Sequence, residues 1–99
     1  MDFDSKYIEI SQKIASGQTI ASLTEIRSSV SHLISICVPP EDIIEGILYH
    51  LLLLLPTKNL NLIALAASDI MARLDSSSKA IFHIEAFVAK SMSIIAGKI

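Results

Sequence analysis

With 99 residues and a formal net charge of −2, the chain has room for one hydrophobic core, yet 52% of its residues are hydrophobic, more than one small core usually hides. Scattered Lys and Arg exclude the basic stripe of a strong nucleic-acid binder, and a single cysteine excludes an internal disulfide and a cysteine-built zinc site. Three Gly and three Pro are too few for the turns of a β-sandwich, so we predict an all-α domain, a single five-helix bundle over 1–99.

The first two predicted helices, about 4–16 and 19–37, are amphipathic. Asp4 or Ser5 can cap the first helix, and Gly17 is placed to end it. Apolar residues at steps of three and four define their inner faces: Phe3, Tyr7, Ile10 and Ile14, then Leu23, Ile26, Val30, Leu33 and Cys37. The place of Cys37 on this stripe predicts a buried, inert thiol rather than a nucleophile.

The third predicted helix, about 40–55, begins after a Pro-Pro pair, and Pro40 suits its first turn. Acidic residues follow at the positive end of the helix dipole, where they act as a cap rather than as a catalytic pair: Glu41, Asp42 and Glu45. The apolar surface covers more than half of the circumference, so this helix should be central. Its apolar run is shorter than the roughly 20 residues that a bilayer requires, which excludes a membrane span.

The fourth and fifth predicted helices cover about 59–74 and 78–96. Asn59 or Asn61 can cap the fourth, and a break over 75–78 supplies the cap of the fifth. The inner stripe of the fourth comprises Leu62 or Ile63, Ala66, Ala67, Ile70 and Leu74. The fifth has a narrow polar stripe formed by Lys79, His83 and Lys90, and it is apolar elsewhere.

A helix that is apolar nearly all round has to be covered on more than one side, by its own bundle or by another subunit. Both explanations remain open at the level of sequence. In the second, the fifth helix is the candidate subunit interface, through Ile81, Ile84, Phe87, Val88 and Met92.

No pattern of catalytic, cofactor-binding or metal-ligating residues is present. His32, His50 and His83 fall on three different predicted helices, and none has a partner at metal-ligand spacing. The three glycines are isolated, so neither a Walker motif nor GxGxxG can be written onto the chain. We therefore predict no catalytic residue, cofactor, metal or small-molecule substrate.

Three segments carry a resemblance to a known family. They are Val38-Pro39-Pro40-Glu41-Asp42-Ile43-Ile44, the run from Leu60 to Leu74 with Asp69 and Arg73, and His83-Ile84-Glu85-Ala86-Phe87-Val88-Ala89-Lys90. Together they resemble the C-terminal collar domain of small subunits of replication factor C, the sliding-clamp loader, over about 7–92. The sequence departs from the family pattern in three places. Cys37 stands where the family usually has Gly, and Pro39 stands where it often has Ser. The break between the fourth and fifth predicted helices, at 75–76, lacks the Gly that is common there.

The resemblance implies an oligomerisation domain that is not itself an enzyme, and a C-terminal fragment of a longer subunit with a separate AAA+ ATPase module. Its partners would be other clamp-loader subunits of the same fold, in the nucleus of a eukaryote or otherwise in the cytoplasm. Direct nucleic-acid binding by this domain is not expected, because DNA and the sliding clamp are handled by the full complex.

Two other functions remain as alternatives. A stand-alone helical adaptor or regulatory bundle would receive a partner's amphipathic helix in a groove lined by the third and fifth helices. A small enzyme or ligand-binding bundle ranks lower, because the sequence contains no polar cluster.

Overall fold

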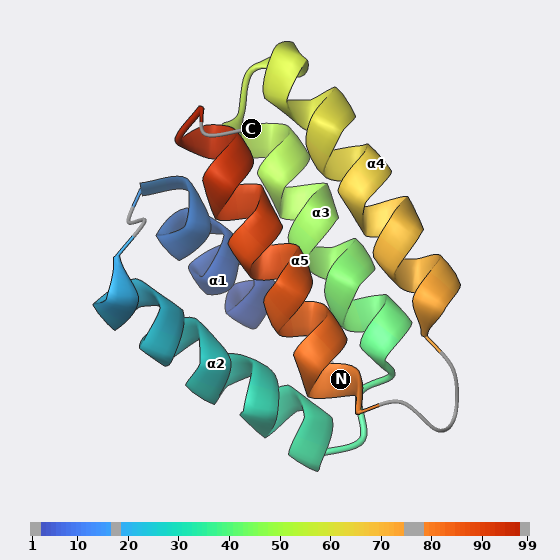
Figure 1. Cartoon of the computed structure of the whole chain (residues 1–99). Helices are drawn as coiled ribbons and strands as arrows, with labels where there is room; N and C mark the ends of the chain where they lie inside the picture. Colours follow the sequence, from blue (N-terminus) through green and yellow to red (C-terminus); the bar gives the residue numbers. More distant parts are fainter. Residues whose placement is uncertain (1–2, 17–18, 75–78, 98–99) are drawn as a thin grey trace.

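The described part of the chain forms five α-helices, one after another (Figure 1). The computed structural model describes residues 3–16, 19–74 and 79–97, and these ranges contain no β-strand. The all-α prediction is confirmed. The helices are α1 (Asp4–Ser16), α2 (Ile20–Ser35), α3 (Pro40–Leu54), α4 (Thr57–Arg73) and α5 (Ala80–Ile95).

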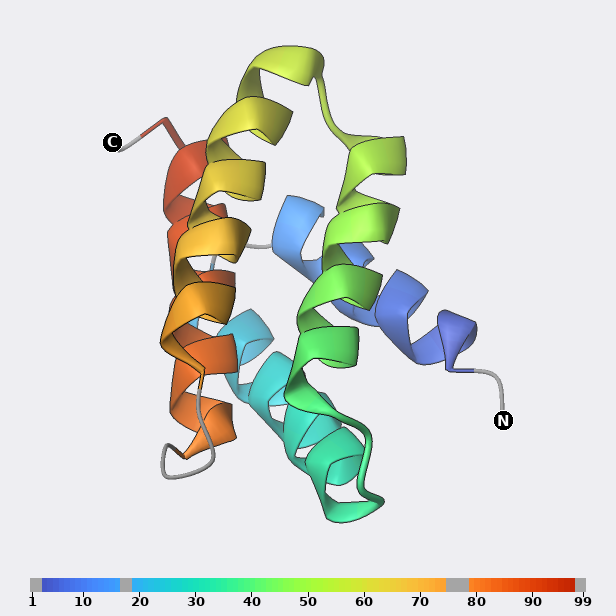
Figure 2. The same cartoon turned by 90° about the vertical axis from the view of Figure 1, so that its right-hand side faces the viewer.

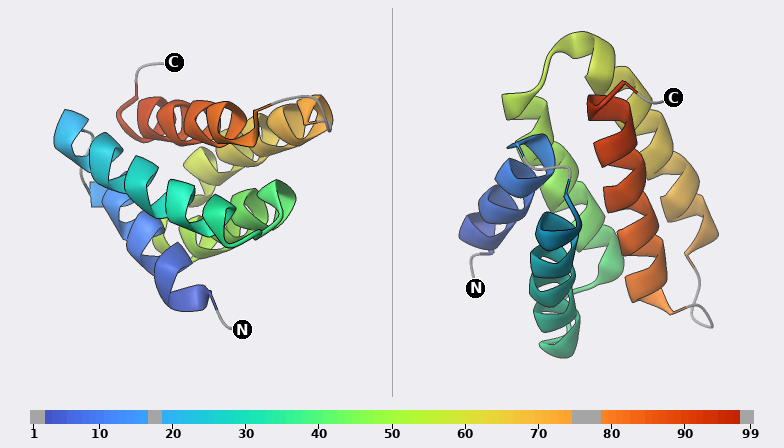
Figure 3. Two further views of the ribbon diagram at one scale, coloured as in Figure 1. Left: turned by 90° about the horizontal axis from the view of Figure 1, so that it is seen from below. Right: turned by 60° about the vertical axis from the view of Figure 1, so that its left-hand side comes forward.

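The helices form two layers closed on one side by α2. The most extensive pairings join α1 to α3 and α4 to α5, and the left panel of Figure 3 shows these two pairs on opposite sides. In Figure 2, α3 and α4 run antiparallel as neighbours, joined by a short connection. The helix α2 packs against α1, α3 and α5.

The core lies between the layers, and every helix contributes to it. Only α3 and α5 contact all four other helices. These are also the two helices with the widest apolar surfaces in the sequence, so the expectation that the third helix is central is correct. The largest fully buried side chains are Ile10, Ile14, Ile26, Val30, Leu33, Ile43, Ile44, Ile47, Leu51, Ile63, Ile84 and Phe87.

The end of α2 differs from the sequence prediction, because the helix stops at Ser35 and not at Cys37. The N–H of Cys37 donates to the carbonyl of Ile34 at 3.0 Å, and the N–H of Val38 donates to that of Leu33 at 3.1 Å. This pair of bonds is a Schellman motif, and it places Cys37 in the left-handed region with a φ of 67°. The prediction that Cys37 is buried is wrong: the thiol is exposed, since the chain has already left the helical path.

The beginnings of the later helices also have identifiable causes. Pro40 is the first residue of α3, as predicted. The helix α4 begins at Thr57, before the expected Asn59 or Asn61 cap, because the extended Pro56 already offers its carbonyl to the N–H groups of Asn59 and Leu60. The helix α5 begins at Ala80, and the expected cap over 75–78 lies outside the described residues.

Candidate interaction surfaces

The five residues predicted as a subunit interface lie mostly inside the bundle. Ile84, Phe87, Val88 and Met92 are buried, and Ile81 is half-buried against the same core. The reason is the central place of α5, whose apolar circumference is covered by the four other helices. Val88 also lines the groove between α2 and α5, whereas another chain could reach Ile84, Phe87 and Met92 only if the bundle opened. The part of these residues in a subunit interface stays a prediction.

The side chains that α5 does present to solvent are few. Phe82 is 62% exposed, and the Nζ of Lys79 lies 5.8 Å from the centroid of its ring. Ala86, Ala89 and Lys90 are exposed as well. Its outer face is therefore mostly small or polar, apart from one aromatic ring.

An apolar groove of about 350 Å³ runs between α2 and α5. Ile20, 83% exposed, and Leu23 form one wall, while Val88 and Ala89 belong to the other. The sequence prediction placed Leu23 on the inner face, but Leu23 lines this groove and is 38% exposed. An ion pair between Arg27 and Glu85 joins the two helices beside the groove. The groove of the adaptor alternative was expected between α3 and α5, whereas this one is lined by α2 and α5.

A second apolar surface lies at the end of α3, next to α1. Leu52, Leu53 and Leu54 are all exposed, Leu53 by 68%. Five consecutive leucines occupy 51–55, and successive residues of a helix point in different directions. Leu51 is buried in the core, and Leu55, which follows the helix, packs partly against it. Beside them, a hollow of about 210 Å³ is lined by Ile8, Gln12, His50, Leu53 and Leu54. We call this region the α3 leucine surface.

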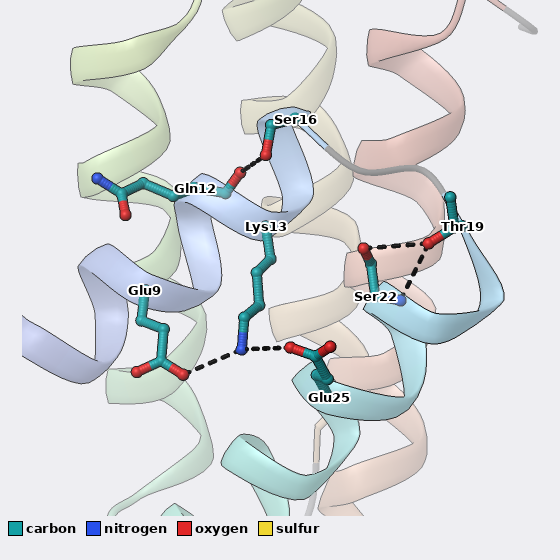
Figure 4. A network of polar contacts seen from close by, with 7 residues as sticks. All are labelled: Glu9, Gln12, Lys13, Ser16, Thr19, Ser22 and Glu25. Atoms are coloured by element: carbon teal, nitrogen blue, oxygen red, sulfur yellow. Dashed lines mark hydrogen bonds and ion pairs between the residues drawn. The ribbon is translucent and has the colours of Figure 1, made fainter.

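Polar contacts fix α1 against α2 (Figure 4). The Nζ of Lys13 lies 2.9 Å from Glu25 of α2 and 3.0 Å from Glu9 of α1. These carboxylates, Glu25 more strongly, raise the pKa of the Lys13 ammonium. At the start of α2, the Oγ1 of Thr19 accepts a hydrogen bond from the N–H of Ser22 at 3.1 Å. The ion pairs of Lys13 hold α1 against α2, and the Thr19 hydrogen bond caps the first turn of α2.

A cleft of about 430 Å³ opens between the first halves of α1 and α3, and we call it the Tyr7 cleft. Gly46 allows the ring of Tyr7 to pack closely against α3, because a Cβ at position 46 would lie only 2.5 Å from ring carbons of Tyr7. Tyr49 and His50 form a further wall, with ring centroids 5.1 Å apart. Asp42 and Glu45 also line the cleft. Burial raises the pKa of the Tyr7 hydroxyl, and the carboxylates of Asp42 and Asp4 raise it further.

The three histidines do not come together. His32 lies on α2, His50 on α3 and His83 on α5, and in the described residues no group of three or more His, Cys, Asp and Glu is placed to hold a metal ion. No helix in the described ranges is long and apolar enough to cross a membrane. The absence of cofactors and metals stays a prediction.

Comparison with known proteins gives a consistent result. The family model described as "Replication factor C subunit 3, C-terminal domain" matches residues 5–99. Replication factor C subunit 3 of Homo sapiens is 38% identical over 93 residues, covering 94% of this chain and 26% of that protein. The Arabidopsis thaliana subunit 3 is 37% identical, covering 95% and 27%. Replication factor C subunit 5 of Schizosaccharomyces pombe is 30% identical, covering 96% and 26%.

The chain therefore spans about a quarter of the length of these relatives. The family model describes the C-terminal domain of a replication factor C subunit. The resemblance noted from Val38 to Ile44, from Leu60 to Leu74 and from His83 to Lys90 is thereby confirmed. On the match of the family model to residues 5–99, this chain belongs to the family of replication factor C C-terminal domains.

Proposed function

We propose that this domain holds clamp-loader subunits together by packing against the corresponding domains of neighbouring subunits. The observation that carries the proposal is the presence of two separate apolar surfaces, the α2–α5 groove and the α3 leucine surface. A subunit inside a ring or arc has a neighbour on each side and needs two different contact surfaces. Its partners would be other replication factor C subunits, in the nucleus of a eukaryote, and its role would be in DNA replication.

The energetics favour contact with protein over exposure to water. Six of the exposed large apolar side chains in the described part of the chain lie on these surfaces, namely Ile8, Ile20, Leu23, Leu52, Leu53 and Leu54, and burying one stabilises a contact by about 1.5–3 kcal/mol. Ile20 and Leu53 are the most exposed members of the two surfaces. Because neither side chain is part of the core, each can be changed without opening the bundle.

Charged replacements test the proposal in the full-length subunit. Ile20→Asp and Leu53→Asp should each weaken co-purification with the other subunits, and the double variant should weaken it further. Ser28→Asp is the matched control, because it adds the same charge at an exposed position of α2. Replacements of Ile84 or Phe87 are unsuitable here, because they would unfold the core instead.

The fold of every variant is checked by its thermal unfolding, which should resemble that of the unmodified subunit. If Ile20→Asp and Leu53→Asp leave assembly as intact as Ser28→Asp does, these surfaces do not hold the complex together and the proposal is wrong.

A further inference from the structure

We draw no further inference here: the strongest candidate, the hollow of about 390 Å³ on the outer face of α4 that is lined by Asn61, Ala64, Leu65 and Ser68, carries nothing, because nothing in the structure shows what covers it.

Discussion

Cys37 occupies the left-handed region at the end of α2, where most side chains are strained and glycine is not. The Schellman hydrogen bonds of Cys37 and Val38 require this conformation. The side chain is exposed, so it gains little from packing. The strain at this position is therefore a local cost that the cysteine does not offset.

Cys37→Gly should accordingly stabilise the domain. The left-handed conformation costs a non-glycine residue about 1–2 kcal/mol, and the greater freedom of glycine in the unfolded chain cancels about 0.5–1 kcal/mol of the gain. A net increase of about 1 kcal/mol in the free energy of unfolding is expected in urea denaturation. Cys37→Ala keeps the strain and should change little; an equal gain from alanine would mean that the thiol, and not the backbone, was responsible.

Gly46 is the residue that lets α1 and α3 approach at the Tyr7 cleft. Gly46→Ala would place a Cβ 2.5 Å from the Tyr7 ring. Overpacking costs about 1–3 kcal/mol, and alanine returns about 1 kcal/mol through its better helix propensity. We expect a net loss of stability of up to about 2 kcal/mol in urea denaturation.

A double-mutant cycle with Tyr7→Ala assigns that loss. In the Tyr7→Ala background the clash is gone, so Gly46→Ala should be neutral or stabilising by up to about 1 kcal/mol. Additive effects in the cycle would contradict the close approach of Gly46 and Tyr7.

At the scale of the helix, local signals account for where some elements begin. Thr19 caps α2 through its side chain, whereas α4 begins at Thr57 after an extended Pro56 without a side-chain cap. Pro56 occupies the N-cap position of α4 in an extended conformation, and its carbonyl accepts hydrogen bonds from the N–H groups of Asn59 and Leu60. The helix therefore begins before either asparagine could cap it.

Thr19→Ala should destabilise the domain by about 1 kcal/mol, because the first turn of α2 loses its side-chain acceptor. Thr24→Ala is a control within the same helix, since Thr24 is exposed and its Oγ1 only donates back to the carbonyl of Ile20. The control should stay within about 0.5 kcal/mol of the unmodified chain. Both are measured by urea denaturation, and equal effects would mean that the cap contributes nothing specific.

At the scale of the whole molecule, two phenylalanines of α5 have opposite surroundings. Phe87 is 0% exposed in the core, while Phe82 is 62% exposed. Their chemistry is the same, so only their position in the bundle distinguishes them.

Phe87→Ala should cost about 3–5 kcal/mol, because it leaves a cavity in the core. Such a loss is a large part of the 5–15 kcal/mol typical of a domain, so partial unfolding at 37 °C is expected in circular dichroism. Phe82→Ala should change the unfolding free energy by less than about 0.5 kcal/mol. A large loss from Phe82→Ala would show that its ring is buried in the folded domain.

The sequence by itself determined the all-α class, the five helices and the wide apolar surfaces of α3 and α5, because helical periodicity and proline placement are local properties. Only the tertiary structure decided which of those apolar residues face solvent. Ile84 and Phe87 are covered because α5 contacts all four other helices, while Leu52 and Leu23 remain 44% and 38% exposed. The Tyr7 cleft was equally beyond prediction, since it depends on a glycine of α3 meeting a ring of α1 far away in sequence.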